Sequence, residues 1–426
     1  MTEMKDGKTA FTPTDLRVTA LCWFGYSCAY AGRLNMGASI LPMSEALGWT
    51  NEALGGIVSC FFMSYACGQL ASGLLAHFFD PRWSFGVAIA GSALMNLAVP
   101  AFPSQASMRA AWFLNGCFQS LMWCSVVKAM ARRVSERAMP KAVVAISSTI
   151  SVGTMCAFGS AALFAHLGFW QGAFYVPAAL LGIAAVLWFA LFRFPREDSE
   201  GAPHAAAKAY PRATRWTGET RGGAGPSARE IAWLVAVVAL ATAACGFLRD
   251  GLSTWAPKIL SDKFGTSSSS SILLALALPM VGLLGAYLNK VVHEREPLVM
   301  KITACCFLAG TALVAVALFA TNASALVPAL AAFAGVTLSM IMVTNAITSL
   351  FCLEYRRVFD SALVAGIVDT LCYAGSSVAT WSLGRASDAG GWNRVFALLA
   401  AAGAAGFALS AAAARRERRV AAAARQ

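Results

Sequence analysis

The sequence predicts an all-α membrane protein with twelve transmembrane helices in two six-helix, pseudo-symmetric bundles. Three observations support this fold class. The 426-residue chain is 58% hydrophobic and 13% charged, whereas soluble domains carry about 25% charged residues. Apolar stretches of about 20 residues, the length that crosses a bilayer, recur throughout the chain. The start of the first predicted helix and an arginine inside it also have counterparts in the second half, 215 and 216 residues later.

Twelve membrane-spanning helices are predicted from these apolar stretches. They cover residues 16–41, 53–76, 84–102, 109–130, 142–165, 173–193, 231–256, 270–289, 299–320, 326–352, 361–383 and 393–414. Residues 194–230 are polar and rich in Arg, Gly, Pro and Ser, which is typical of a flexible linker. We therefore expect an N-terminal bundle over 1–193, a cytoplasmic linker over 194–230 and a C-terminal bundle over 231–426.

The basic residues predict how the helices cross the membrane. If the N-terminus is inside, the segments on the inner side hold 26 Lys and Arg residues and those on the outer side hold five. An excess of Lys and Arg marks the cytoplasmic side. We therefore expect a multi-pass protein of the cell (inner) membrane with both termini in the cytoplasm. The net charge of +12 is then a signal of topology, and no nucleic-acid partner is expected.

Two arginines, Arg33 and Arg249, lie inside predicted helices. They are 216 residues apart, and the first and seventh predicted helices start 215 residues apart. Parallel repeats around an axis along the membrane normal would place both arginines at a central cavity. A buried arginine is costly in a membrane, and its guanidinium fork binds carboxylate or phosphate groups bidentately. We therefore predict that the two arginines clamp a small anionic substrate.

The alternative for each arginine is a permanent acidic partner, or a side chain that reaches the membrane surface. Asp250 follows Arg249 directly in the sequence. We do not expect these two side chains to pair, because adjacent residues of a helix do not face each other. The anion clamp is therefore the preferred interpretation at both positions.

Polar and aromatic residues on several other predicted helices are expected to line the same cavity. Tyr26 and Tyr30 share one helical stripe with Arg33, because the three residues follow one another at intervals of four and three. Each polar residue of this kind could instead form hydrogen bonds that hold helices together. The predicted substrate-binding residues are Arg33, Arg249, Tyr26, Tyr30, Gln69, Gln119, Trp123, Asn345 and Tyr373.

An acidic residue, Asp369, lies in the middle of the eleventh predicted helix. A carboxylate at this depth is costly unless it is paired or protonated. We predict a coupling role, in which Asp369 partly neutralises the arginines of the empty cavity. When an anion binds, Asp369 would contact a cationic group of the substrate or take up a proton. The alternative is a fixed salt bridge between helices.

No cofactor, metal site or catalytic centre is expected. The 12 Cys all fall in apolar stretches without the spacing of a metal site, and the four His fall at span ends or in loops. The chain has no GxxxxGK[ST] motif, and its linker is too short for a nucleotide-binding domain. These features argue against an ATP-driven pump and against a membrane enzyme.

Five stretches, spread over both halves, are similar to those of a known family. They are YSCAYAGRLNMG (26–37), a loop with Pro81-Arg82, LNGCFQSLMW (114–123), LRDGLSTWAP (248–257) and GIVDTLCYAGSSVA (366–379). The sequence thereby resembles the organophosphate:phosphate antiporters of the major facilitator superfamily, which implies the major facilitator fold. The resemblance matches Arg33 and Arg249 to the family's two phosphate-binding arginines. The positions that it matches to the lining of the family's cavity are Tyr26, Tyr30, Gln119, Trp123 and Tyr373.

The chain departs from the glycerol-3-phosphate transporter of that family at five positions. Leu34 and Gln69 stand where that transporter has Lys, and its substrate-site His falls near Ile150. His77 stands in place of a loop Asp, and Asp369 in place of a Gly. The cavity is thus less positive than in the phosphate exchangers. This favours a monoanion or zwitterion, such as a carboxylate, a phosphonate or an amino-bearing compound, over a phosphate dianion.

We therefore expect a secondary transporter of a small organic anion, which is an organophosphate, a phosphonate or a carboxylate. It is expected to work as a monomer in the lipid bilayer by rocker-switch alternating access, with phosphate or a proton as counter-substrate. Two alternatives remain open, a membrane sensor of a phosphorylated metabolite with the same fold and a proton-coupled efflux carrier. The arginine pair argues against cationic drugs as substrates of such a carrier.

Overall fold

The computed structural model describes residues 11–75, 80–192, 227–282, 284–296, 298–355 and 361–424. These residues form helices joined by short loops, and none of them lies in a strand. His77 and most of the predicted linker 194–230 lie outside the described residues.

The helices of the first half are α1 (Pro13–Leu47), α2 (Asn51–Leu75), α3 (Pro81–Ala101), α4 (Gln105–Ser120), α5 (Met122–Arg133), α6 (Met139–Ser147), α7 (Thr149–His166) and α8 (Gly172–Leu191). Those of the second half are α10 (Ala228–Phe264), α11 (Ser268–Gly282), α12 (Leu284–Arg295), α13 (Val299–Asn322), α14 (Leu326–Asn345), the π-helical turn η3 (Ala346–Phe351), α15 (Cys352–Glu354) and α16 (Ser361–Ala424). Several predicted spans are therefore interrupted, for example at Leu121 between α4 and α5. Hydropathy does not reveal such breaks, because the run of apolar side chains continues through them.

Within the described residues, nine helical stretches are long and apolar enough to cross a membrane. The last of them, Leu363–Glu417, has 55 residues and a break at Gly390 and Gly391, so it crosses twice. The two further crossings are α1 and the α4–α5 pair, which are less apolar because they carry the buried polar residues discussed below. Together these stretches account for twelve crossings, and the predicted fold class is confirmed.

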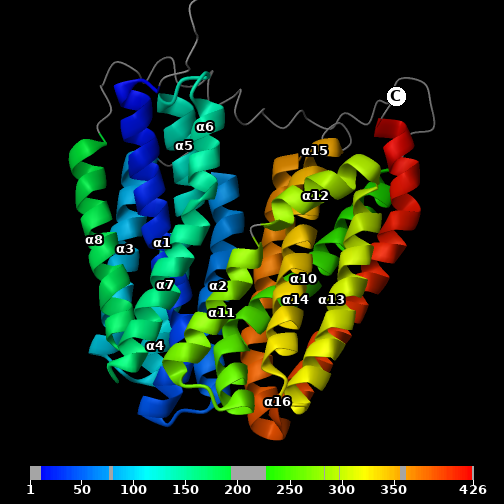
Figure 1. Ribbon diagram of the computed structural model, residues 1–426. Coiled ribbons are helices and arrows are strands. Elements are labelled where there is room, and N and C mark those ends of the chain that lie inside the picture. Colours follow the sequence, from blue (N-terminus) through cyan, green and yellow to red (C-terminus); the bar gives the residue numbers. More distant parts are fainter. Residues whose placement is uncertain are drawn as a thin grey trace, which may run out of the picture.

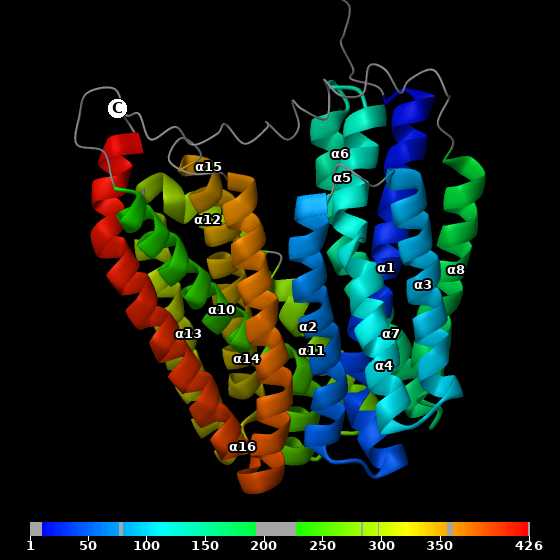
Figure 2. The same cartoon turned by 180° about the vertical axis from the view of Figure 1, so that it is seen from behind.

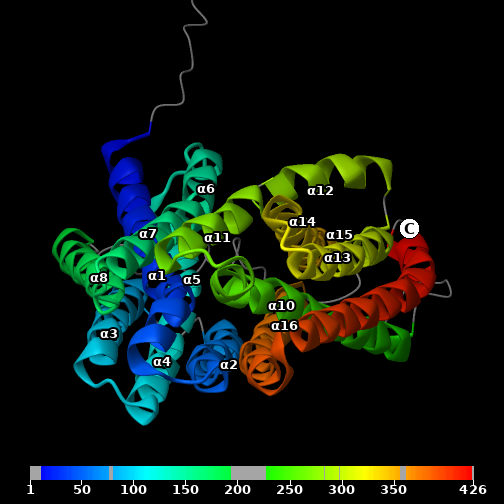
Figure 3. The ribbon, with the colours of Figure 1, turned by 60° about the horizontal axis from the view of Figure 1, so that its bottom comes forward.

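The helices lie in two groups side by side, an N-terminal group (α1–α8) and a C-terminal group (α10–α16) (Figures 1 and 3). The two groups lie close together at the lower end of Figure 1 and apart at the upper end (Figures 1 and 2). The buried apolar residues follow the same pattern. One cluster contains residues of both groups, such as Leu54 of α2 and Trp255 of α10. A second cluster, with Val126 and Trp188, belongs to the N-terminal group alone.

The helices α1 and α10 have the same type of N-terminal cap, an internal proline and the same type of C-terminal glycine, as expected of repeated halves. Each begins with a capping box, in which side chains satisfy free backbone N–H groups. Each ends at a glycine in the left-handed conformation, which favours glycine because it has no Cβ atom. The matching residues are Thr12 and Asp15 with Ser227 and Glu230, Pro42 with Pro257, and Gly48 with Gly265.

Asp15, which precedes the first predicted span, joins α1 to the loop between α5 and α6. Its carboxylate accepts hydrogen bonds from the backbone N–H of Ser135 at 2.7 Å and from the Ser135 hydroxyl at 3.0 Å. The bond from the Ser135 N–H, together with bonds from Thr12, lowers the pKa of Asp15 to about 2. The carboxylate therefore stays charged near neutral pH and holds the upper end of the N-terminal group together.

Candidate functional site

Arg33 of α1 is buried, with 7% of its surface exposed, and lies among aromatic rings. Its guanidinium carbon is 4.4 Å from the ring centre of Tyr65, 4.9 Å from that of Tyr30 and 5.7 Å from that of Phe61. Such cation–π contacts stabilise a cation without neutralising its charge. Among the described residues, no carboxylate forms an ion pair with Arg33, and its Nη2 atom is buried without a hydrogen-bond partner. The guanidinium therefore offers an unneutralised charge and a free donor.

Gln119 of α4 fixes the orientation of Arg33. Its Oε1 atom accepts a hydrogen bond from Arg33 Nε at 2.9 Å. Its Nε2 atom donates to the carbonyl oxygen of Ala29 at 3.1 Å and to the hydroxyl of Ser92 at 3.0 Å. Because the amide nitrogen is held by these acceptors, the amide oxygen is left to face the guanidinium.

A buried network of amides extends from this point through the N-terminal group. The Nδ2 atom of Asn35 donates to Asn96 Oδ1 at 2.9 Å and to the carbonyl oxygen of Ala173 at 3.1 Å. Both Asn96 and Asn115 donate to the carbonyl oxygen of Gly32, at 3.2 and 3.0 Å. These hydrogen bonds tie α1 to α3, α4 and α8, so the helix that carries the first arginine is firmly anchored.

Arg249 of α10 has different surroundings, and the expectation that it would not pair with Asp250 is wrong. The Asp250 carboxylate accepts hydrogen bonds from Arg249 Nε at 2.8 Å and from Nη2 at 2.9 Å, which is a bidentate ion pair. Adjacent Cα–Cβ bonds do diverge on a helix, but the long arginine side chain folds back and brings its fork to the next residue. The third nitrogen, Nη1, donates to the Thr344 hydroxyl of α14 at 3.0 Å.

Asp250 is in turn held by α16. The Ser376 hydroxyl donates to Asp250 Oδ2 at 2.6 Å. The helices α10 and α16 lie so close that a Cβ atom built on Gly375 would be 2.0 Å from the carbonyl oxygen of Ala243. Only glycine permits this approach, which brings Ser376 within reach of the carboxylate. The arginine, its acid and both hydroxyl partners thus belong to the C-terminal group.

Asp369 of α16 is half-buried and, among the described residues, its side chain has neither a hydrogen bond nor an ion pair. It interacts electrostatically with Arg249 and Tyr65. The neighbouring Thr370 hydroxyl donates to the Ala66 carbonyl of α2 at 3.4 Å, so Asp369 lies close to the contact between the two groups. The fixed salt bridge that was the alternative for Asp369 is not found in the described part of the chain.

Tyr373 of α16 lies within electrostatic range of both arginine environments. Its ring centre is 4.7 Å from that of Tyr65, in an edge-to-face contact between the two groups. It interacts electrostatically with both Arg33 and Arg249. Gln69 joins the same cluster, because its Nε2 atom donates to the Tyr65 hydroxyl at 3.1 Å.

The three remaining predicted residues differ in their positions. The ring centre of Tyr26 is 5.2 Å from that of Tyr30 and 5.5 Å from that of Trp123. These rings therefore adjoin the aromatic cage of Arg33, which consists of Tyr30, Phe61 and Tyr65. Trp123 is 40% exposed. The side chain of Asn345, at the end of α14, forms no hydrogen bond with another described residue. Its predicted contact with the substrate therefore stays a prediction.

Sequence analysis missed Phe61, Tyr65 and Asp250 as parts of this site. Phe61, Tyr65 and Gln69 follow one another at intervals of four residues, which places them on one face of α2. That spacing was a usable signal for the two aromatic residues. Asp250 gave no such signal, because its role depends on the conformation of the arginine side chain.

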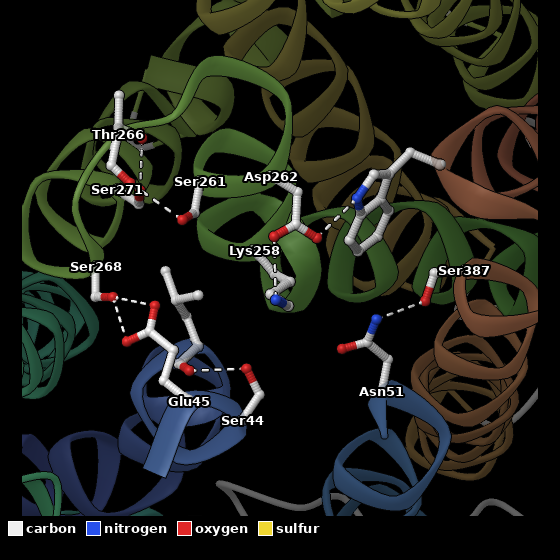
Figure 4. Close-up of polar contacts among 12 residues, drawn as sticks. Ser44, Glu45, Asn51, Lys258, Ser261, Asp262, Thr266, Ser268, Ser271 and Ser387 are labelled. Carbon is white, nitrogen blue, oxygen red and sulfur yellow. Dashed lines mark hydrogen bonds and ion pairs between the residues drawn. The ribbon is translucent and has the colours of Figure 1, made fainter. Parts of the chain in front are cut away.

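The lower ends of the two groups are joined by hydrogen bonds (Figure 4). The Ser268 hydroxyl of α11 donates to the Glu45 carboxylate of α1 at 2.7 Å. Nearby, the Asp262 carboxylate accepts hydrogen bonds from Lys258 Nζ at 3.0 Å and from the Trp392 indole N–H at 3.1 Å. The bond from Trp392 ties the end of α10 to α16, and the bond from Lys258 lies within α10.

Asp388 of α16 caps a helix of the other group. Its carboxylate accepts hydrogen bonds from the backbone N–H groups of Asn51 at 3.2 Å and Glu52 at 2.7 Å, the first residues of α2. The Asn51 side chain also donates to the Ser387 hydroxyl at 3.0 Å (Figure 4). A carboxylate satisfies the free N–H groups at a helix start and favours its positive dipole end. The contact between the groups thus includes a helix cap supplied from across the interface.

Comparisons with known sequences identify a family and several relatives. The sequence profile described as "Major Facilitator Superfamily" matches residues 22–380. "Probable anion transporter 6, chloroplastic" of Arabidopsis thaliana is 27% identical over 175 residues, which are 39% of this chain and 32% of that protein. "Protein TsgA" of Salmonella newport (strain SL254) is 29% identical over 191 residues, 44% of this chain and 46% of that protein. The chain thus matches less than half the length of these curated relatives.

Solved structures of similar fold include those of transporters. The nucleoside transporter NupG superposes with a TM-score of 0.69 and 13% identity, over 94% of this chain and 99% of that chain. A D-xylose–proton symporter superposes with a TM-score of 0.69 and 12% identity, over 94% of this chain and 97% of that chain. At such low identity the similarity shows the shared fold alone.

Proposed function

Because the chain belongs to the Major Facilitator Superfamily, we propose that it is a secondary active transporter that moves a small organic anion across the cell (inner) membrane. The coarser part of this statement follows from its family and relatives: it is a multi-pass membrane transporter and not an enzyme. The finer part, the anionic substrate, rests on one observation, the buried and unpaired Arg33.

The surroundings of Arg33 favour an anionic ligand. An unpaired charge in a membrane is costly, and a bound anion would offset that cost. The cage leaves Nη2 without a hydrogen-bond partner, while Gln119 holds the guanidinium from its Nε side. A carboxylate or phosphate oxygen would satisfy the free donor and neutralise the charge together.

The substrate would contact both groups of helices. Tyr373 of the C-terminal group interacts electrostatically with Arg33 and Arg249, and Asp369 lies close by on the same helix. We therefore place the substrate between the two groups, with Arg33 as its first contact and Arg249, within its ion pair with Asp250, as the second. The remaining members of the proposed site are Tyr26, Tyr30, Gln69, Gln119, Trp123, Asn345 and Tyr373.

Alternating access by a rocker switch would use the joined lower end as one gate. Residues 1–193 and 231–426 would rock as two bodies about the site, with 194–230 as the linker. The hydrogen bonds from Glu45 to Ser268 and from the start of α2 to Asp388 would break when the lower end opens. With both termini in the cytoplasm, the lower end faces away from the cytoplasm and the structure corresponds to an inward-facing state.

The balance of charges favours a small anion with one negative charge. Among the described residues Arg33 has no ion pair, and Arg249 is neutralised by Asp250. One positive charge is therefore available when Asp369 is protonated. A carboxylate, a phosphonate or a phosphate ester in its monoanionic form fits this balance. Two curated plant relatives, each named a "Probable anion transporter", support an anion as the substrate class. The organophosphate:phosphate antiporter assignment remains part of this proposal, with phosphate or a proton as the counter-substrate of a monomeric carrier.

One observation favours coupling to protons over exchange for phosphate. Asp369 is half-buried beside the site, and its carboxyl group has no partner among the described residues. A carboxyl group in this position can release or take up a proton as the charge of the site changes. A proton-coupled carrier of organic anions is therefore the second candidate.

Uptake by proteoliposomes tests the proposed function. Purified protein would be reconstituted with or without phosphate inside, and radiolabelled carboxylates, phosphonates and phosphate esters would be supplied outside, each beside an uncharged analogue. We expect uptake of at least one anion and none of the uncharged analogues. Stimulation by internal phosphate would indicate exchange, and stimulation by an imposed proton gradient would indicate proton coupling.

Two conservative variants assign the uptake to Arg33. In Arg33→Lys the charge is kept but the planar fork is lost, and we expect uptake to fall to background while the protein still inserts and folds. Arg17→Lys, at an exposed position of α1, is the matched control and should transport normally. Transport by Arg33→Lys at a near wild-type rate would remove Arg33 from the site, and the proposed anion function would lose its main support.

A further inference from the structure

The Asp250 carboxylate occupies the part of Arg249 with which an anionic substrate would bind. It receives hydrogen bonds from Nε at 2.8 Å and from Nη2 at 2.9 Å. This side-on arrangement is the one that guanidinium groups form with carboxylate and phosphate ligands. Arg33 has no such carboxylate among the described residues. The protein therefore carries a ligand-like anion of its own on one arginine and none on the other.

The neighbouring helices hold this ion pair in place. Ser376 donates to Asp250 Oδ2 at 2.6 Å, and Thr344 accepts from Arg249 Nη1 at 3.0 Å. Only 18% of the Arg249 side chain and 17% of the Asp250 side chain are exposed. Separating the pair would leave two charges poorly solvated, which is strongly unfavourable for a buried pair. Arg249 and Asp250 therefore stay paired when a small anion binds nearby, and the anion does not readily displace Asp250.

We propose that Asp250 is a specificity-determining residue, a built-in counter-anion of Arg249 that restricts the site to substrates with a single negative charge. This inference rests on the proposed function and deepens it. A monoanion is matched by the unpaired charge of Arg33. The second charge of a dianion would find Arg249 already neutralised and would lie near the carboxylates of Asp250 and Asp369. Removing the charge of Asp250 would free the guanidinium of Arg249 and admit dianions.

A matched pair of ligands tests this proposal directly. Propyl phosphate is a dianion at about pH 8, since the second pKa of a phosphate monoester is about 6, and its methyl diester is a monoanion of similar shape. Dissociation constants would be measured calorimetrically with full-length protein in detergent micelles. We expect the wild type to bind the diester more tightly. In Asp250→Asn we expect the ratio of the two constants to shift by at least about tenfold in favour of the dianion.

Two further variants separate charge from position. In Arg249→Gln/Asp250→Asn the freed guanidinium is absent, so the gain in dianion binding seen with Asp250→Asn should disappear. Ser376→Ala removes a hydrogen bond to Asp250 but keeps its charge, and the preference for the monoanion should remain. A preference that weakened as much in Ser376→Ala as in Asp250→Asn would mean that the position of Asp250, and not its charge, sets the selectivity, which would contradict the proposal.

The possible outcomes are distinguishable. A wild type that bound the dianion more tightly would overturn the inference without any variant, even if Asp250→Asn failed to fold. A folded Asp250→Asn protein with an unchanged ratio would overturn it as well. Binding of neither ligand by the wild type, together with no anion uptake in proteoliposomes, would instead overturn the proposed function itself and the inference with it.

Discussion

The N-terminal group and the C-terminal group each place one arginine at the corresponding point of their first helix, yet they treat its charge differently. Around Arg33 there are aromatic rings and one amide oxygen. Around Arg249 there are a carboxylate and a hydroxyl, so that each guanidinium nitrogen has an acceptor. The position of the arginine is common to both halves, whereas its electrostatic surroundings differ between them.

This difference separates a charge that is available to a ligand from a charge that supports the fold. A cation held by cation–π contacts keeps its electric field, and removing it leaves no unpaired acid behind. A cation in a buried ion pair is neutralised, and removing it exposes its partner. The repeated architecture thus allows one half to specialise in binding while the other provides a fixed ion pair. The predictions below test that division.

The largest expected effect is on stability. We expect Arg249→Gln to lower the free energy of unfolding by about 3–5 kcal/mol, because it leaves the Asp250 carboxylate buried without its partner. Arg33→Gln should leave stability unchanged or raise it, because it removes an unpaired buried cation. Thermal unfolding in detergent would measure both, and Arg249→Gln/Asp250→Asn should recover most of the loss. Equal destabilisation by both single variants would break the comparison.

The next effect concerns coupling through Asp369, which interacts electrostatically with Arg249 and with Tyr65 beside Arg33. We expect Asp369→Asn to remain folded and to exchange substrate across the membrane, because the arginines are intact. Accumulation driven by a pH gradient should be lost, because the amide cannot take up or release a proton. Counterflow and gradient-driven uptake in the same proteoliposomes would separate the two activities. If the variant kept the pH dependence of the wild type, Asp369 would be a structural residue and phosphate exchange would be favoured.

A smaller effect is expected from the single hydrogen bonds that orient each arginine. Gln119→Ala removes the acceptor for Arg33 Nε and should weaken substrate affinity by about 1.5–3 kcal/mol, the range for bonds to charged groups. Thr344→Val removes the acceptor for Arg249 Nη1 and should change affinity far less, because the ion pair with Asp250 remains. Binding measurements on both variants would show the difference. A change in protein abundance alone would mean that Gln119 is structural.

The smallest effect is expected at Tyr373, which lies within range of both arginines. Tyr373→Phe keeps the ring contact with Tyr65 and removes one hydroxyl. We expect a loss of about 0.5–1.5 kcal/mol in substrate affinity, the usual net value of one hydrogen bond. The transport rate at saturating substrate should change little. Wild-type affinity in this variant would show that Tyr373 contributes its ring and not its hydroxyl.

The fold was predictable because the number and direction of the membrane crossings depend on the lengths of the apolar stretches and on the positions of the charged residues between them. Apolar length and the placement of Lys and Arg indicate the crossings without any knowledge of tertiary contacts. The interruptions at Leu121 and at Ser148 were not predictable, because a break in backbone hydrogen bonding leaves hydropathy unchanged. The end of the eleventh crossing at Gly390 was nearer to expectation, since the predicted spans stop at 383 and resume at 393.

The site was predictable in its positions and not in its pairings. The constant interval between the halves was sufficient to select Arg33 and Arg249. The pairing of Arg249 with Asp250 required the side-chain conformation, which a rule about adjacent positions on a helix does not contain. Tyr65 was overlooked because an aromatic residue in an apolar helix resembles ordinary core. The roles of the site residues in transport remain predictions.

The helix cap that Asp388 provides to α2 turns two backbone amides into a natural reporter of conformational exchange. The N–H groups of Asn51 and Glu52 are bonded to that carboxylate, so they are shielded from deuterated solvent only while the two groups meet at this end. If the lower end opens as proposed, both amides become exposed, and their deuterium uptake then reports the population of the open form. Opening at this end could therefore be followed by mass spectrometry on the unmodified protein, with no attached label and no substitution among its twelve cysteines. A substrate that accelerates exchange at these two amides would be one that drives the cycle.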